Sequence, residues 1–321
     1  MINCIALVIF LFLAGAAPGI AQDWPAKIVK IVVPFGAGST PDVVARLIAD
    51  QLSEKYSGST FIVENKPGAS GNLGTAAVAK AAPDGATIGI SISGPLAINS
   101  LLFSELPYDP QKDIPPITQL VTQPSALAVN PALKVNSVAE LVALIKNNPG
   151  KYNFSSIGNG SLSHLAMEAI AIKAGTKLVH VPYPGSPQAI IAVIRNDTQM
   201  ACLPAISVVP QQRSGAVKIL AVSTAKRSPY LPDSPTLNES GIDVEADAWM
   251  GLIAPGGAPK SLIDKINDDL VAILRLLLVR AKLATQLMEP IGSSPEEFRA
   301  RINSEIARWA PVIKAANVKI D

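Results

Sequence analysis

The sequence predicts an α/β protein with two domains, and three observations lead to this fold class. Short apolar segments rich in β-branched residues are followed repeatedly by Gly-rich loops and then by helical patterns. This order gives parallel strands joined by right-handed crossovers. The strand segments are almost continuously apolar, as in strands covered on both faces, and the chain of 321 residues has a length that suits two domains.

The first strand–loop–helix unit shows the pattern most clearly. The apolar strand Ile28–Val33 is followed by Gly36 and Gly38, which tolerate backbone angles that other residues resist. Thr40 is suited to a helix N-cap and Pro41 to the first helical position. The loop therefore lies where free N–H groups and the positive end of a helix dipole favour an anion such as a carboxylate.

Similar patterns predict the remaining elements in order. Residues 117–129 read as extended with Pro124 in the middle. A proline belongs at the edge or at a break of a strand, so we expect this segment to link the two domains. Further strands are expected at residues 60–64, 87–93, 153–156, 178–181, 198–202, 217–223 and 248–253, and helices at about 72–81, 96–102, 137–145, 164–174, 189–195, 260–288 and 295–316.

The N-terminus has the features of an export signal. An apolar run at residues 5–13 is followed by small residues, with Gly19 and Ala21 in the positions that precede cleavage. We therefore predict a signal peptide at residues 1–21 and a periplasmic mature protein. The alternative, a retained membrane anchor, conflicts with the short length of the run. Cys202 is then the single cysteine, and its apolar neighbours predict a buried structural thiol.

Charge and motifs exclude several classes of function. The net charge is +2 without a basic run, which argues against nucleic-acid binding. Neither a P-loop nor the G-x-G-x-x-G spacing occurs, and His164 and His180 lack the spacing of a zinc site. We therefore expect no cofactor and no metal.

Loops rich in Gly, Ser, Thr and Asn are the feature that remains. Five of them are predicted at the carboxyl ends of strands, where ligands bind in open α/β sheets. Uncharged hydroxyls and N–H groups can hold a carboxylate reversibly, although each loop could equally be only a turn and a helix cap. Asp42 would repel an acid, so we interpret it as a residue that fixes its loop. The loops are residues 36–42, 68–72, 91–95, 158–164 and 183–188.

Eight motifs, in order along the mature chain, resemble the Bug family, the TctC-like extracytoplasmic solute receptors of tripartite tricarboxylate transport systems. The motifs are VVPFGAGS (32–39), VENKPGASGN (63–72), APDG (82–85), LPYDP (106–110), NPGK (148–151), SHLA (163–166), VHVPY (179–183) and AKRSP (225–229).

The resemblance implies a periplasmic binding protein with two Rossmann-like lobes joined by two extended crossover segments, similar to the type II arrangement. Lobe 1 would comprise residues 22–124 and 226–321, and lobe 2 residues 125–225. A small carboxylate would lie between the lobes. The protein would be a monomer whose partners are integral membrane subunits of the TctA/TctB kind or a sensor.

The resemblance also implies the ligand contacts. His164 lies one turn into a helix, where it could brace the loop instead of touching the ligand. The first lobe would offer Phe35, Gly38, Ser39, Ser70 and Ser93, and the second Gly160, Ser161, Ser163, His164 and Tyr183.

Two departures from the family pattern bear on the ligand. Ser39 stands where the family usually has glycine, and Pro41 replaces a threonine, so the polar contacts of this loop differ. Leu203 stands where many members have an acidic residue, which would pair with an amine. The leucine favours a dicarboxylate or an aromatic carboxylate over an amino acid.

Two other classes of function stay open. An exported α/β hydrolase or transferase would use Ser161 or Ser163 with His164, and an interaction protein would use the two lobes only as a docking surface. The abundance of neutral loops without a catalytic motif favours a binding protein over an enzyme.

Overall fold

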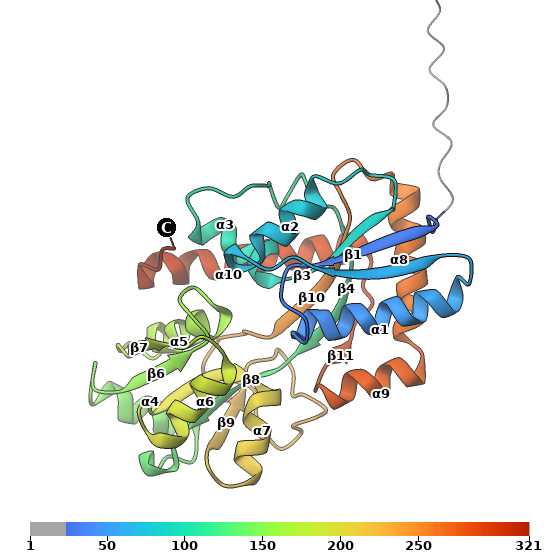
Figure 1. Cartoon of the computed structure of the whole chain (residues 1–321). Coiled ribbons are helices and arrows are strands. Elements are labelled where there is room, and N and C mark those ends of the chain that lie inside the picture. The colour runs from blue at the N-terminus through green and yellow to red at the C-terminus, as the bar shows by residue number, and fades with distance from the viewer. Residues whose placement is uncertain (1–23, 321) are drawn as a thin grey trace, which may run out of the picture.

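The computed structural model describes residues 24–320, which form two lobes, each built on one sheet (Figure 1). The predicted signal peptide lies outside the described residues. We name as the larger lobe the six-stranded sheet with its helices: β1 (Ile28–Val33), β2 (Thr60–Asn65), β3 (Thr87–Ile92), β4 (Pro116–Gln123), β10 (Ala248–Ile253), β11 (Glu289–Pro290), α1 (Thr40–Lys55), α2 (Asn72–Ala79), α3 (Asn99–Leu102), α8 (Lys260–Leu274), α9 (Leu277–Thr285) and α10 (Pro295–Ala316).

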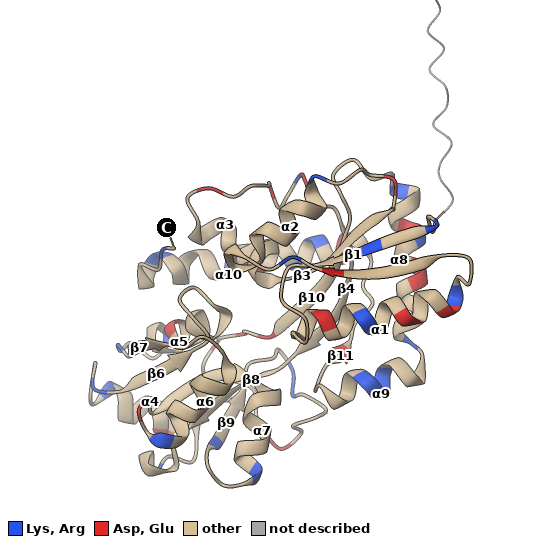
Figure 2. Cartoon of the chain, in the orientation of Figure 1, with Lys and Arg blue, Asp and Glu red and all other residues tan. Residues whose placement is uncertain are grey.

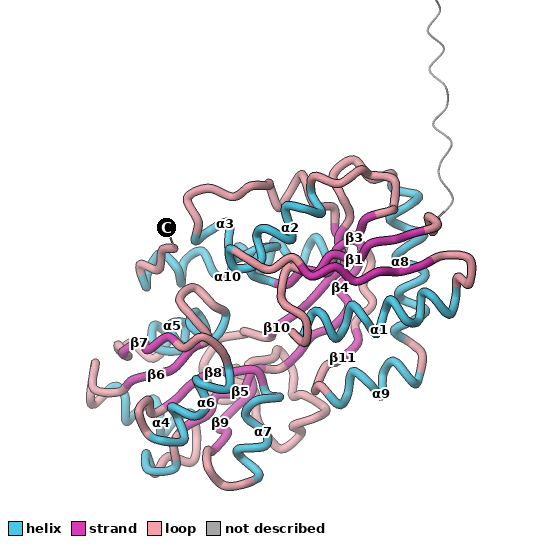
Figure 3. Tube along the Cα trace, viewed as in Figure 1, coloured by secondary structure: helices cyan, strands magenta, loops and turns pink. Residues whose placement is uncertain are grey.

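The smaller lobe is the five-stranded sheet with its helices. It consists of β5 (Ser125–Val129), β6 (Asn153–Ser156), β7 (Val179–Pro182), β8 (Met200–Pro204), β9 (Lys218–Val222), α4 (Val138–Lys146), α5 (Leu162–Lys173), α6 (Ser186–Arg195) and α7 (Ala205–Arg213). Figure 3 shows the strands of each lobe surrounded by helices and connected by loops.

Strand order places the glycine-rich loops at one edge of each sheet. The larger sheet has the order β11-β4-β10-β3-β1-β2, and β1 pairs in parallel with both β2 and β3. The smaller sheet has the order β7-β6-β8-β5-β9, with β6 parallel to β7 and β8. The carboxyl ends of parallel neighbours meet at the same edge, so the loops that follow β1, β2 and β3 gather there, as do those after β6 and β7. The predicted α/β fold with two lobes is confirmed.

Two crossovers join the lobes side by side. Pro124 separates β4 from β5, as the sequence predicts, and the second crossover runs from β9 back to β10. Ser223 ties the two together, because its hydroxyl donates to Ser125 O at 3.2 Å and to Ala246 O at 3.0 Å. We retain the predicted boundaries, residues 124/125 and 225/226, as a proposal.

Helix α10 packs against both lobes. Its first half contributes Phe298 and Ile302 to a core with Trp249 of β10. Its second half contributes Trp309 and Ile313 to the core of the smaller lobe. The predicted start of this helix is confirmed, because Ser294 and Glu297 form a reciprocal capping box.

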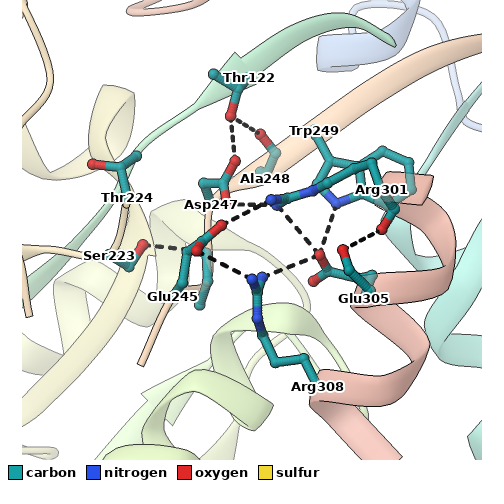
Figure 4. A network of polar contacts seen from close by, with 12 residues as sticks. Thr122, Ser223, Thr224, Glu245, Asp247, Ala248, Trp249, Arg301, Glu305 and Arg308 are labelled. Atoms are coloured by element: carbon teal, nitrogen blue, oxygen red, sulfur yellow. Dashed lines mark hydrogen bonds and ion pairs between the residues drawn. The ribbon is translucent and has the colours of Figure 1, made fainter. Parts of the chain in front are cut away.

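A cluster of five charged side chains fixes α10 to the second crossover (Figure 4). The cluster, which we call the hinge cluster, consists of Glu245, Asp247, Arg301, Glu305 and Arg308. The guanidinium of Arg301 lies 2.8 Å from the carboxylate of Glu245, 2.7 Å from that of Asp247 and 3.2 Å from that of Glu305. Arg308 reaches Glu245 at 3.1 Å and Glu305 at 3.3 Å.

Glu305 is the centre of the hinge cluster. It is fully buried and accepts hydrogen bonds from the indole N–H groups of Trp249 and Trp309. Burial raises the pKa of Glu305, and the two arginines oppose that rise. The carboxylate is therefore held by four donors from β10 and α10.

One expectation about the helices is wrong, and one helix is missing from the expected set. Residues 260–288 do not form one helix, because Leu276 takes an extended conformation (φ −62°, ψ 133°) and starts α9 as a separate helix. This break turns Val279 and Leu283 into the core with Ile266, whereas Leu277 at the start of α9 is 85% exposed. The sequence analysis does not predict helix α7, which contains Pro210.

The hinge cluster predicts a large effect of a single substitution. Arg301→Met would leave Asp247 and Glu305 buried without their main partner, which destabilises a protein by about 3–5 kcal/mol. Arg227→Ala is a matched control, because it breaks an ion pair with Glu239 that is half exposed on both sides and is worth roughly 0–1 kcal/mol. Urea unfolding of both variants measures the difference, and equal losses would contradict the role given to the hinge cluster.

Candidate functional site

The loop between β1 and α1 is fixed from beneath by Asp42. The Asp42 carboxylate accepts hydrogen bonds from Gly38 N, from the guanidinium of Arg46 and from the Asn65 amide, each at 2.9 Å. Asn65, at the end of β2, also donates to Phe35 O at 2.9 Å. Burial alone would raise the pKa of Asp42, but these hydrogen bonds outweigh burial and hold it below the usual range. The predicted role of Asp42 in fixing the loop is confirmed.

Ser39 occupies the N-cap position of α1, one residue before the predicted Thr40. Its backbone is extended (φ −68°, ψ 158°), and its side chain does not cap the helix. The Ser39 Oγ atom is buried and has no hydrogen-bond partner among residues 24–320. A hydroxyl donor therefore stands unused beside the positive end of a helix dipole.

The three loops that follow β1, β2 and β3 are in contact with one another. A Cβ added to Gly71 would lie 2.9 Å from Cζ of Phe35 and 2.7 Å from Cγ of Pro95. Only glycine fits at this crossing, where φ is +90°. The structure thus brings Phe35 to the loops that carry the predicted residues Ser70 and Ser93.

The loop after β2 holds a strained backbone. Ala69 and Ser70 both have positive φ, at 46° and 54°, a conformation that non-glycine residues rarely adopt. The Asn99 amide donates to Ser70 O at 3.3 Å and to the side chain of Asn72 at 2.7 Å. Such strain gathers at ligand-binding loops. Ser70 is exposed there, whereas Ser93 is only 4% exposed.

In the smaller lobe, the hydroxyls of Ser161 and Ser163 hold the loop between β6 and α5. Ser161 Oγ donates to Gly158 O at 2.7 Å and lies 3.0 Å from Ser163 Oγ. Ser163 Oγ accepts the Ile157 N–H at 2.9 Å. Ser161 is also the N-cap of α5. Both predicted serines are therefore brought together, and both already bond to their own loop.

His164 braces this loop through its ring. The Gly160 N–H donates to His164 Nδ1 at 3.1 Å, so the ring proton lies on Nε2, which is 3.6 Å from Glu168. The ring stacks on His180, with centroids 3.7 Å apart and planes at 9°. These contacts show His164 bracing the loop, and its contact with a ligand stays a prediction.

His180 supports the same loop from the neighbouring strand β7. Its Nε2 lies 2.6 Å from Ser156 Oγ, and that hydroxyl is also bonded to the backbone of Gly158. Burial, together with the nearby His164, lowers the pKa of His180 to about 4. His180 is therefore neutral near pH 7.

The Ser–His geometry does not support the hydrolase alternative. His164 Nδ1 is occupied by the Gly160 N–H, and among residues 24–320 its ring makes no hydrogen bond to Ser161 Oγ or Ser163 Oγ. The pair that does form, Ser156 and His180, lies on a serine that is fully buried, where a substrate does not reach.

Gly160 lies at a contact between the lobes. A Cβ there would approach Cδ1 of Ile320 to 2.5 Å and Cδ1 of Leu102 to 2.7 Å, whereas a Cβ on Gly38 would meet nothing within 4 Å. The two glycines thus have different surroundings, one buried by the larger lobe and one exposed. Tyr183 is placed next to the loop, since its N–H donates to Ser156 O at 3.0 Å.

A cavity of about 470 Å³ lies elsewhere, between α5 and α10. Its charged lining residues are paired, Lys173 with Asp243 and Arg308 with Glu245, so it offers little net charge to an anion. Among residues 24–320 no group of His, Cys, Asp and Glu could hold a metal ion, and no helix is long and apolar enough to cross a membrane.

Sequence reasoning missed the residues that support the loops from below. Asn65 and Arg46 hold Asp42, and Ser156, His180 and Glu168 hold the loop before α5. The position of two of these residues could have indicated them, because Asn65 and Ser156 lie at the ends of strands that pair in parallel with β1 and β7. The stacking of two histidines far apart in sequence has no local signature.

Comparison with known proteins gives consistent matches over most of the chain. The family model described as Tripartite tricarboxylate transporter family receptor matches residues 44–318. Protein BugT of Bordetella pertussis is 33% identical over 315 residues, which cover 97% of this chain and 96% of that protein.

Two solved structures have the same fold. The R. palustris protein Rpa4515, determined with adipate, is 34% identical with a TM-score of 0.80, over 92% of this chain and 99% of that one. MatC from Rhodopseudomonas palustris, determined with bound malate, is 30% identical with a TM-score of 0.74, over 90% and 100% of the two chains.

The low pKa of His180 predicts a pH-dependent stability. Between about pH 4, where folded His180 titrates, and about pH 6.5, where an unfolded histidine does, the unfolded chain binds more protons. Stability must therefore fall as the pH falls through this window. We expect the melting temperature to drop less between pH 7 and pH 5 in His180→Phe than in the parent protein, and parallel curves would contradict this.

Proposed function

Because the chain belongs to the tripartite tricarboxylate transporter receptor family, whose members are periplasmic substrate-binding receptors and not enzymes, we propose that it binds a small organic carboxylate between its two lobes and delivers it to a membrane transporter. The observation that carries the proposal is the unpartnered hydroxyl of Ser39 at the N-terminus of α1. A buried hydroxyl without a partner costs about 1–3 kcal/mol, and a bound carboxylate would supply the missing acceptor.

The surroundings of Ser39 suit an anion without a cationic partner. Asp42 and Arg46 neutralise each other beneath the loop. What remains for a ligand is the dipole of α1 together with hydroxyl and N–H groups, which favour a carboxylate. We propose that Phe35, Gly38, Ser39, Ser70 and Ser93 form the contacts of the larger lobe and that Ser161, Ser163 and Tyr183 form those of the smaller lobe.

The class of acid is proposed from the relatives and from one buried position. The relatives determined with adipate and with malate make a dicarboxylate the first candidate. Leu203 is fully buried in an apolar core with Ala126 and Ile190, so this position offers no carboxylate to an ammonium group. We therefore favour a dicarboxylate or an aromatic carboxylate over an amino acid.

Contacts from both lobes would couple binding to closure. A ligand shifts such an equilibrium only by its differential affinity for the closed form, which requires that each lobe contribute. The closed receptor, acting as a monomer, would then be recognised by membrane subunits of the transporter or by a sensor. Gly160 would serve as the close contact between the lobes.

Calorimetric titration with a panel of acids tests the proposal. The panel contains malate, adipate, an aromatic carboxylate, an amino acid and a neutral sugar. We expect saturable binding of at least one carboxylate without an amino group at roughly micromolar Kd, about −8 kcal/mol. Heat for the sugar or the amino acid alone, with none for the other acids, would overturn it.

A pair of variants tests the role of Ser39. Ser39→Ala removes a buried hydroxyl without a protein partner, so the melting temperature of the free protein should not fall, whereas Kd should rise about tenfold for a lost hydrogen bond to a charged group. Thr198→Val is the control, because its hydroxyl is likewise buried without a partner in the described chain but lies away from these loops. If the two variants bind the carboxylate with equal affinity, Ser39 does not contact the ligand.

A further inference from the structure

Three consecutive leucines protrude at the turn between α8 and α9. Leu276, Leu277 and Leu278 are 45%, 85% and 54% exposed, and we call them the leucine tip. They are exposed because α9 starts anew at this turn and directs Val279 and Leu283 into the core instead. Transfer of these exposed leucine side chains from water to an apolar environment would be favourable.

The leucine tip is flanked in the sequence by positive charge. Arg275, Arg280 and Lys282 are exposed, and no acidic residue stands between Asp269 and Glu289 in the sequence. Within residues 24–320 none of these three cations forms a salt bridge, whereas Lys260 and Lys265 at the other end of α8 pair with Asp264 and Asp269. Figure 2 shows basic residues on α9 without an acidic one.

We propose that the leucine tip and its three cations dock this receptor on a bilayer that contains anionic phospholipid. Exposed aliphatic side chains flanked by arginine and lysine have the composition of an interfacial membrane contact. The cations would meet the phosphate groups, while the leucines enter the boundary between headgroups and acyl chains. The proposed contact shares no residue with the loops of the carboxylate site.

A protein partner fits the same surface less well. The residues that dominate protein interfaces are Trp, Tyr and Arg, and leucine is under-represented among them. The leucine tip has no aromatic residue, and three leucines on one turn form a narrow protrusion instead of the broad patch that a stable interface needs. The unpaired charge, by contrast, complements the negative headgroups of anionic phospholipids.

Vesicle sedimentation with the mature chain tests the proposal. The probes are vesicles of equimolar phosphatidylglycerol and phosphatidylcholine and vesicles of phosphatidylcholine alone. We expect partitioning into the anionic vesicles only, with a loss at high salt because screening weakens surface electrostatics. Equal binding to both compositions, or binding to neither, overturns the proposal.

Two sets of variants separate the apolar and the charged contributions. The double variant Leu277→Asp with Leu278→Asp should abolish partitioning into anionic vesicles. Its melting temperature should not fall, because both leucines are exposed. Arg275→Gln, Arg280→Gln and Lys282→Gln together should lower the partition coefficient roughly fivefold per side chain. The control removes the same charge from exposed lysines of the smaller lobe, with Lys146→Gln, Lys151→Gln and Lys177→Gln, and should have little effect.

Other occupants of this surface give different results. Partitioning that survives both sets of variants overturns the proposal, as does self-association in sedimentation velocity that disappears with Leu277→Asp, because the surface would then bind a second copy. Calorimetry of the same variants with the carboxylate should be unchanged, so failure here leaves the proposed ligand site intact.

Discussion

The buried carboxylate of Glu305 is the constraint on which the arrangement of the lobes depends. A carboxylate taken out of water costs several kcal/mol unless donors surround it, and here two arginines and two indole N–H groups do so. These donors come from α10 and β10, and Arg301 and Arg308 also reach Glu245 and Asp247 on the second crossover. The hinge cluster therefore fixes α10, which packs on both lobes, to the second crossover between the lobes. This joins the lobes along one side and leaves the loops at their sheet edges to determine what the protein binds.

In the loops themselves, the charged side chains are paired within the protein, and uncharged hydroxyl and N–H groups are available to a ligand. Asp42 is neutralised by Arg46 and holds Gly38, while two stacked histidines hold the loop before α5. Each loop is thereby rigid before a ligand arrives, which lowers the entropy that binding must overcome. A site of hydroxyls and N–H groups also binds an acid without a buried cation whose desolvation would offset the gain. Binding without a buried cation suits a receptor that must release its ligand again.

Local features of the sequence were read correctly, and long-range ones were not. Strands β1 to β10, the break at Pro124, the start of α10 at Pro295, the buried Cys202 and the loop-fixing role of Asp42 are all predicted from residues close together in the sequence. The break after Leu274, by contrast, is decided by which leucines the core can accept, and the stacking of His164 on His180 depends on the pairing of β6 with β7. Gly160 is expected from the resemblance to contact the ligand, and its burial against Leu102 and Ile320 could not be inferred without the placement of the two lobes. Which of the proposed residues touch a ligand remains a proposal.

The account requires that one acid contact the loops of both lobes at the same time. Hydrogen exchange of backbone amides, measured with and without a saturating carboxylate, tests this directly, because a bound anion and a closed structure both slow the exchange of amides that they cover. The account predicts simultaneous protection of residues 34–42 in the larger lobe and 157–164 in the smaller lobe, with exchange in α4 unchanged. Protection confined to one of the two loops, or spread evenly over the whole chain, would contradict it.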